Sequence, residues 1–223
     1  MKYIDIHTHN PSNDSGKLAI RNLLNPDTLE KNLAVPGYYS IGIHPWHIHP
    51  DHWQEDVVNV EKWIHHPQVL AIGEAGLDRL TDLPLDIQTM VFKSMVMLSE
   101  QSQKPLIIHS VRTHQEILLL HRQLLPSQPW ILHGFNLRWT IAEAFIDAGF
   151  YLSFGSAILH HQTAATNSFV KAPMSSVFLE TDEAQIDIRE IYRRAAELKG
   201  LREEDLLNNI EERFKKIMKY EGS

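Results

Sequence analysis

Short apolar runs that end in a polar residue recur along the chain, and most are followed by a stretch with helical spacing. Short runs rich in Ile, Leu, Val and aromatic residues are typical of buried parallel strands. The pattern therefore predicts strands in the runs Tyr3–His9, Lys17–Leu24, Tyr38–His44, Val69–Glu74, Pro105–His109, Trp130–His133, Phe150–Phe154 and Val177–Asp182.

Apolar residues three and four positions apart predict helices between these runs, because that spacing lines one face of a helix. One such segment runs from Trp53 to Ile64, and another lies near the end of the sequence between Leu206 and Met218. In the segment after the fourth run, the apolar residues predicted to share one face are Ile87, Met90, Val91, Met95 and Leu98.

Strands that alternate with helices predict an α/β protein, and eight such strands favour a (β/α)8 TIM-like barrel. A doubly wound open sheet uses the same alternation and remains the alternative. The stretch between Asn10 and Gly16 is too short for a helix, so the first βα unit is expected to be reduced. Because no internal repeat or break in composition divides the chain, we expect a single domain over residues 1–223.

The residues that close five of the eight runs have side chains that can bind metal ions. They are His7, His9, Glu74, His109, His133 and Asp182. The C-terminal ends of the strands of a parallel barrel meet on one face, where the active site forms. Packing of a hydrophobic core does not account for this set, and the pattern predicts a metal site on that face.

Four of these residues have a further reason to be ligands. His7 and His9 are two positions apart in a predicted strand, so both point to the same face and could bind one ion together. Glu74 lies in an apolar stretch, where an unpaired charge would be costly, and sharing by two cations would remove that cost. Asp182 could bind one ion and accept the proton of an attacking water.

The composition narrows the choice of metal and of substrate. The 223 residues include 14 histidines and no cysteine, so any ion must be held by imidazole and carboxylate groups. Such ligands fit Zn, Mn, Fe, Co or Ni, whereas Mg fits less well. The formal net charge of −7 argues against a broad basic surface of the kind that binds duplex DNA.

The sequence offers no sign of a membrane protein. No apolar run approaches the roughly 20 residues that span a bilayer, and the N-terminal segment lacks the apolar stretch of a signal peptide. We therefore expect a cytoplasmic protein without membrane association, and the sequence points to no particular protein partner.

Six segments that contain these residues resemble, in order, the successive motifs of the TatD family of metal-dependent hydrolases, which are amidohydrolase-like barrels. The segments are Asp5–His9, Gly42–Trp46, Ile72–Asp78, Ile107–Ser110, His133–Phe135 and Glu180–Asp182. Gln88 and Phe92 are similar to the family's helix after the fourth strand, and Asn209–Phe214 is similar to its last helix. The resemblance covers nearly the whole chain.

The resemblance implies a (β/α)8 fold and a centre of two divalent metal ions. The family's pattern assigns His7, His9 and Asp182 to one ion, His109 and His133 to the other, and Glu74 as the bridge. Asp182 and Glu74 are then the expected catalytic residues. The expected substrate contacts are His44, which ends the third run, and Arg112, which follows the fifth.

The family is associated with metal-dependent deoxyribonuclease activity, often on single-stranded ends. The resemblance therefore implies that a water activated by two metal ions cleaves phosphodiester bonds at DNA 3′ ends. Four regions depart from the family's pattern. Val111 stands where the family commonly has Arg after the fifth-strand residues His109 and Ser110, and Arg112 comes one position later. The chain before Gly42 is shorter, and the loops Gly134–Leu137 and Glu183–Ile186 are altered, the latter being more acidic.

Because these loops would face the substrate, two alternatives to a nuclease stay open. The first is a hydrolase of a small amide, lactone or phosphate ester on the same barrel. The second, of another class, is a non-catalytic barrel that binds a metal or a partner. A complete ligand set that includes Asp182 argues against the second alternative, because metal storage needs no positioned base.

Overall fold

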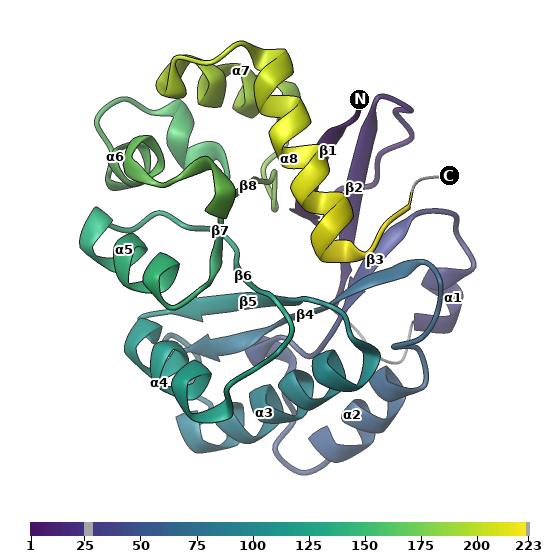
Figure 1. Cartoon of the computed structure of the whole chain (residues 1–223). Coiled ribbons are helices and arrows are strands. Elements are labelled where there is room, and N and C mark those ends of the chain that lie inside the picture. Colours follow the sequence, from purple (N-terminus) through teal and green to yellow (C-terminus); the bar gives the residue numbers. More distant parts are fainter. Residues whose placement is uncertain (25–28, 222–223) are drawn as a thin grey trace. The chain divides into compact units, whose positions relative to one another are not determined.

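The computed structural model of the chain describes residues 1–24 and 29–221. Its first two strands follow one another directly, and from the second strand on strands alternate with helices (Figure 1). The strands are β1 (Tyr3–Thr8), β2 (Lys17–Leu23), β3 (Tyr38–Ile41), β4 (Val69–Asp78), β5 (Leu106–Val111), β6 (Trp130–Leu132), β7 (Tyr151–Phe154) and β8 (Val177–Leu179). The helices are α1 (Leu29–Leu33), α2 (Trp53–Glu61), α3 (Leu85–Ser102), α4 (His114–Leu124), α5 (Trp139–Asp147), α6 (Ala164–Lys171), α7 (Ile188–Lys199) and α8 (Glu203–Met218).

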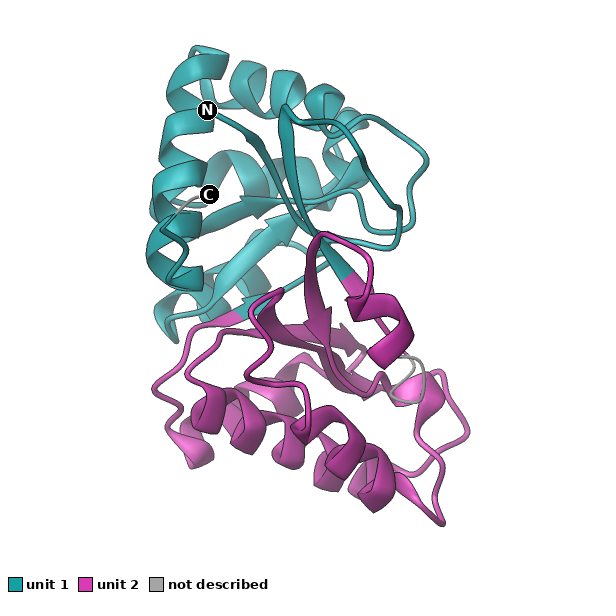
Figure 2. Ribbon diagram, turned by 90° about the vertical axis from the view of Figure 1, so that its right-hand side faces the viewer, with its two compact units in different colours: residues 1–21, 131–223 teal, residues 22–130 magenta. Residues whose placement is uncertain are grey.

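The described residues also contain three short 3-10 helices: η2 (Pro45–His47), η3 (Ser156–Leu159) and η4 (Met174–Ser176). The chain divides into two compact units, which Figure 2 draws in teal and magenta. Unit 1 comprises Met1–Arg21 and Ile131–Ser223, and unit 2 comprises Asn22–Trp130. Each unit is described by itself.

In unit 1, parallel strand pairs bring the two ends of the chain together. Strand β1 pairs with β2, with Tyr3 opposite Lys17, while β6 pairs with β7 and β7 with β8. A parallel bridge between Thr8 and Asp182 joins the end of β1 to the residues that follow β8. Residues far apart in the sequence thereby meet at the C-terminal end of β1.

Helix α7 fixes β1 in place through a buried tyrosine. The hydroxyl of Tyr192 accepts a hydrogen bond from the Ile4 amide at 3.1 Å and donates one to the Ile4 carbonyl at 3.0 Å. The Tyr192 ring also packs edge-on against Tyr3, with 5.2 Å between the ring centroids. Because both backbone groups of Ile4 are satisfied, the strand is held in register as it enters the core.

In unit 2, β3, β4 and β5 are successive parallel neighbours. Strand β4 continues beyond Glu74 to Asp78, further than the apolar run predicts. Pairing with β5 continues to Asp78, which lies opposite Val111. Gln88 of α3, which is fully buried, supports this end of the strand. Its side chain accepts from the Asp78 amide at 2.8 Å and donates to the Asp78 carbonyl at 3.0 Å. These bonds satisfy the backbone at the strand end, where a loop would otherwise begin.

Gly76 allows β4 and β5 to approach closely beside the candidate ligands. A Cβ atom on Gly76 would collide with the backbone of His109, which lies opposite it in β5. We expect Gly76→Ala to lower the free energy of unfolding by about 2 kcal/mol or more, measured by urea titration, because overpacking strains a core. Gly155→Ala is the control, since its Cβ would lie 3.4 Å from the nearest atom. Equal losses in both variants would contradict a close approach at Gly76.

The structure contains all eight predicted strands and the three predicted helices, and no helix lies between β1 and β2, as expected. The predicted buried face of α3 is wrong at one residue. Met90 is 46% exposed, whereas Val91, Met95 and Leu98 are buried. Gln88, Val91 and Met95 share the buried face because they are three and four positions apart, whereas Met90, two positions after Gln88, lies on another face. Among the described residues, no helix is long and apolar enough to cross a membrane.

Candidate metal centre

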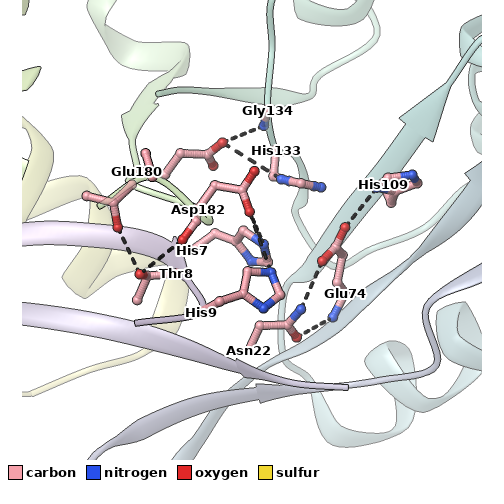
Figure 3. A network of polar contacts seen from close by, with 12 residues as sticks. His7, Thr8, His9, Asn22, Glu74, His109, His133, Gly134, Glu180 and Asp182 are labelled. Carbon is pink, nitrogen blue, oxygen red and sulfur yellow. Dashed lines mark hydrogen bonds and ion pairs between the residues drawn. The ribbon is translucent and has the colours of Figure 1, made fainter. Parts of the chain in front are cut away.

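The first group of candidate ligands lies in unit 1 (Figure 3). His7 Nε2 is 3.6 Å and His9 Nε2 is 3.5 Å from the same atom, Asp182 Oδ1. Both distances are longer than a good hydrogen bond. Two atoms that each lie about 2.1 Å from one ion, at tetrahedral angles, are roughly 3.4 Å apart. The spacing therefore fits ligands of a common ion.

Backbone hydrogen bonds hold Asp182 in this position. Its amide donates to the His7 carbonyl at 3.0 Å, and its carbonyl accepts from the His9 amide at 3.1 Å. Asp182 has a φ of +53°, in the left-handed region that residues other than glycine seldom adopt. Such strain is often found at functional sites, where the surrounding contacts enforce it. Here it turns the carboxylate toward the two histidines.

His133, at the end of β6, belongs to the same group. Its ring centroid is 4.4 Å from that of His7. His7, His133 and Asp182 can each offer one ligand atom such that all three atoms lie within 4.8 Å of one another. Within unit 1, the structure thus brings together four of the six predicted ligands.

Glu180 is a buried carboxylate beside His133 that had no predicted role as a ligand. Its side chain is fully buried, and Oε1 accepts from the Gly134 amide at 2.5 Å and lies 3.8 Å from His133 Nδ1. Oε2 has no hydrogen-bond partner among the described residues. A carboxylate next to a ligand histidine commonly orients its ring. The sequence feature that could have identified Glu180 is its position two residues before Asp182, at the end of a buried strand.

Asp5 is a second buried carboxyl of unit 1 without a predicted role. Its oxygens accept from the Thr181 amide at 2.9 Å and from the Thr181 hydroxyl at 2.6 Å. Burial raises the pKa of Asp5 to about 7, although these hydrogen bonds oppose the shift. Asp5 and Thr181 also line a pocket of about 330 Å³, together with Thr8, Asn10, Lys17, Gln185, Asp187 and other residues.

The second group lies in unit 2 around Glu74. Glu74 Oε1 is 2.8 Å from His109 Nδ1 and 3.3 Å from His44 Nε2. The side chain of Asn22 fixes the glutamate, because its amide donates to Glu74 Oε2 at 2.9 Å while its oxygen accepts from the Glu74 backbone amide at 2.9 Å. Asn22, another residue without a predicted role, thus leaves Oε1 directed at the two histidines.

Asp78 holds the far side of the His109 ring. His109 Nε2 lies 3.0 Å from Asp78 Oδ2, which also accepts from the Trp46 indole at 2.7 Å. Burial alone would raise the pKa of this carboxyl, but hydrogen bonds from the Leu80 amide, the His109 ring and the Trp46 indole lower it. A carboxylate that accepts from one ring nitrogen directs the other toward an ion. Nδ1, on the Glu74 side, is therefore the suited ligand atom.

His44 differs from His109 in the nitrogen that faces Glu74, which is Nε2 in His44 and Nδ1 in His109. Its Nδ1 accepts from the backbone amide of Trp46 at 3.1 Å, so this nitrogen carries no hydrogen. Burial lowers the pKa of His44, although Glu74 opposes the shift, and the ring is neutral with its proton on Nε2. His44, Glu74 and His109 can each offer a ligand atom within 4.8 Å of the others. The Nε2 proton of His44 points a hydrogen-bond donor at Glu74, and the contact of His44 with substrate remains a prediction.

Arg112 directly follows β5 in unit 2, and its side chain is exposed. Its φ of +55° is in the left-handed region, like that of Asp182. Arg112 lies three residues after the candidate ligand His109. Its contact with substrate remains a prediction. The same holds for the assignment of ligands to two ions and for the shared carboxylate of Glu74.

Polar groups gathered at the C-terminal ends of parallel strands are typical of the active sites of α/β barrels, and here these groups are imidazoles and carboxylates that could hold a metal ion. The family model described as TatD related DNase matches residues 20–219. The chain therefore belongs to the TatD-related DNase family, which confirms the resemblance seen in the sequence. His7 and His9 lie ahead of the matched range.

Two curated relatives illustrate the match. The uncharacterized metal-dependent hydrolase YjjV of Escherichia coli K12 is 30% identical over 152 residues, which are 66% of this chain and 58% of the relative. Deoxyribonuclease Tat-D of Schizosaccharomyces pombe is 27% identical over 164 residues, 67% of this chain and 52% of the relative. The alignments thus span less than two thirds of these relatives.

A solved structure shows the fold. The crystal structure of YjjV, described as a TatD homolog from Escherichia coli K12, matches with a TM-score of 0.85 at 20% sequence identity. The match covers 96% of each chain. It confirms the predicted (β/α)8 TIM-like barrel over the doubly wound alternative.

Proposed function

We propose that the chain is a metal-dependent hydrolase that cleaves phosphodiester bonds, with single-stranded DNA ends as substrate. The observation that carries this proposal is the common approach of His7 Nε2 and His9 Nε2 to one carboxylate oxygen of Asp182. Membership of the TatD-related DNase family and the deoxyribonuclease name of the Schizosaccharomyces pombe relative support the substrate class.

The donor atoms suit the metals that the composition favours. Imidazole nitrogen and carboxylate oxygen fit Zn, Mn, Fe, Co or Ni. We propose two ions, with His7, His9 and Asp182 binding one, His109 and His133 the other, and Glu74 shared. When bound, such ions lower the pKa of a water molecule and polarise the bond that is attacked.

The protein's own groups move protons and orient the substrate. In the proposal, Asp182 accepts the proton of the attacking water and later returns it to the leaving group. His44 donates a hydrogen bond from Nε2 to a substrate oxygen or to Glu74. Because the chain carries a net charge of −7, its affinity for a long polyanion is weak away from the metal ions. Short single strands and the frayed ends of duplexes are therefore favoured over intact duplex DNA.

The acidic loop after Asp182 favours one second candidate. Glu183 is exposed directly beside the proposed base, where it would repel a polyanion. A small amide, lactone or phosphate ester would not meet this repulsion. Such a substrate would use the same ligands and the same base.

The test is a metal analysis of the purified protein combined with a hydrolase screen. Labelled single-stranded DNA, its duplex, a small chromogenic phosphodiester and a set of lactones are each incubated with Mn, Mg or Zn. Preferential cleavage of the single strand supports the proposal. Turnover confined to lactones would replace it with the small-substrate hydrolase, and bound metal without any turnover would support a non-catalytic barrel.

His44 provides a specific prediction within this scheme. Because its proton lies on Nε2, His44→Ala should leave the metal content per chain unchanged while kcat/KM falls about ten-fold or more, as for a lost hydrogen bond to a charged group. Metal content is measured by elemental analysis, with His109→Ala as the matched variant of a proposed ligand. A loss of metal in His44→Ala equal to that in His109→Ala would show that His44 is a ligand.

A further inference from the structure

Trp46 of unit 2 has a large, exposed side chain that lies beside His44 and His109, the two histidines that approach Glu74. Its side chain is 62% exposed, and among the described residues it is the one aromatic residue in the set of exposed large hydrophobic side chains. Single exposed apolar residues are common on protein surfaces. Trp46 differs from such residues because hydrogen bonds hold both its backbone and its indole.

Two hydrogen bonds fix Trp46. The indole Nε1 donates to Asp78 Oδ2 at 2.7 Å, and the backbone amide donates to His44 Nδ1 at 3.1 Å. Asp78 is itself fully buried and bound through its backbone to Gln88. The only polar atom of the indole is therefore satisfied within the protein, and the exposed remainder of the ring is purely apolar.

Neither of the two histidines beside the ring stacks parallel to it. The centroid of Trp46 lies 5.1 Å from that of His44 at an interplanar angle of 86°, and 6.2 Å from that of His109 at 73°. Both are edge-to-face contacts. An exposed, fixed indole with edge-on histidine neighbours has the properties of a stacking platform, because little conformational entropy is lost when a planar group settles on it.

We propose that Trp46 is a specificity-determining residue that stacks on a planar aromatic group of the substrate next to the bond that is cleaved. The inference rests on the proposed function and names the nucleobase of a terminal nucleotide as that group. An aryl group of a small ester would offer the same chemistry.

The charge of the protein favours stacking as the source of affinity. A chain with a net charge of −7 cannot rely on phosphate neutralisation over a broad surface. Stacking of a base on an aromatic side chain adds to binding affinity and needs no positive charge. It also requires an unpaired base, which agrees with the proposed preference for single strands over duplex.

The test measures binding to protein stripped of metal with a chelator, so that no cleavage occurs. Two probe pairs are compared: a short single strand with its analogue that lacks the terminal base, and phenyl phosphate with methyl phosphate. Wild type should bind the aromatic member of at least one pair about ten-fold more tightly. Trp46→Ala should abolish that difference, and Trp46→Phe, which keeps a ring but loses the bond to Asp78, should retain most of it.

Two controls separate stacking from a structural role. Trp63→Phe alters another tryptophan of unit 2, whose ring contacts His66, and should behave as wild type. If Trp46→Phe loses the difference as fully as Trp46→Ala, Trp46 acts only by positioning Asp78, and the inference fails. It also fails if wild type does not distinguish the members of either pair. Absence of hydrolysis by the metal-loaded wild type would instead refute the proposed function, because the binding comparison involves no turnover.

Discussion

Asp182→Asn is expected to lower kcat for a small chromogenic phosphodiester by about 10²–10⁴-fold, the range typical of a lost general base. The amide has the shape of the carboxylate and an oxygen that can still face His7 and His9, but it cannot accept a proton. The measurement is steady-state turnover at saturating metal, with metal content determined on the same samples. Retention of most of the wild-type kcat would show that Asp182 is not the base.

The choice of asparagine protects the fold. Asp182 has a φ of +53°, and asparagine tolerates that conformation better than alanine does. The hydrogen bonds to His7 and His9 use only backbone atoms, so the substitution leaves them in place. Glu183→Gln is the matched control, because it removes the same charge from the next, exposed residue. The control should keep turnover of the small diester near the wild-type level.

The same pair of variants separates the reaction class from the substrate. If Asp182→Asn abolishes turnover of the small diester while wild-type protein leaves DNA uncut, the metal-dependent hydrolase stands and the deoxyribonuclease proposal falls. If Glu183→Gln increases cleavage of single-stranded DNA without changing turnover of the small diester, repulsion by the acidic loop limits the natural substrate.

Glu74→Ala should reduce bound metal more than any other single ligand substitution. If Glu74 is shared by two ions, its loss weakens both positions, and metal content should fall close to zero. His109→Ala should remove about half of the metal, because loss of even an outer partner costs about 10–100-fold in metal affinity. Elemental analysis of each variant, after dialysis against a fixed metal concentration, gives the number of metal ions bound per chain.

The control for folding follows from the contacts of Glu74. The alanine variant also leaves the amide of Asn22 without its acceptor, which costs about 1–3 kcal/mol. Glu74→Gln keeps an oxygen for Asn22 and removes only the charge, so it should lose metal with less loss of stability. Equal metal loss in Glu74→Ala and His109→Ala, at matched folding, would show that Glu74 is not shared.

The sequence by itself determined the order of elements and most candidate ligands. Apolar runs identify the strands because buried parallel strands have no polar face, and this holds for β1 as well as for β8. The H-x-H spacing of His7 and His9 places both side chains on one face of a strand, whatever the partner strands are. The family motifs name Glu74, His109 and Asp182 for the same reason, since strand ends are local features.

Only the tertiary structure decided how the ligands are held. The sequence marks Glu74 as a polar residue at the end of a run, but Asn22, 52 positions earlier, aims its carboxylate. The proton of His44 lies on Nε2 because the next turn presents the Trp46 amide to Nδ1. Such contacts join residues that are distant in the chain or depend on one backbone turn, and hydrophobic periodicity carries no information about either. The exposure and anchoring of Trp46 were decided in the same way, because Asp78 reaches its indole only once β4 has extended past Glu74.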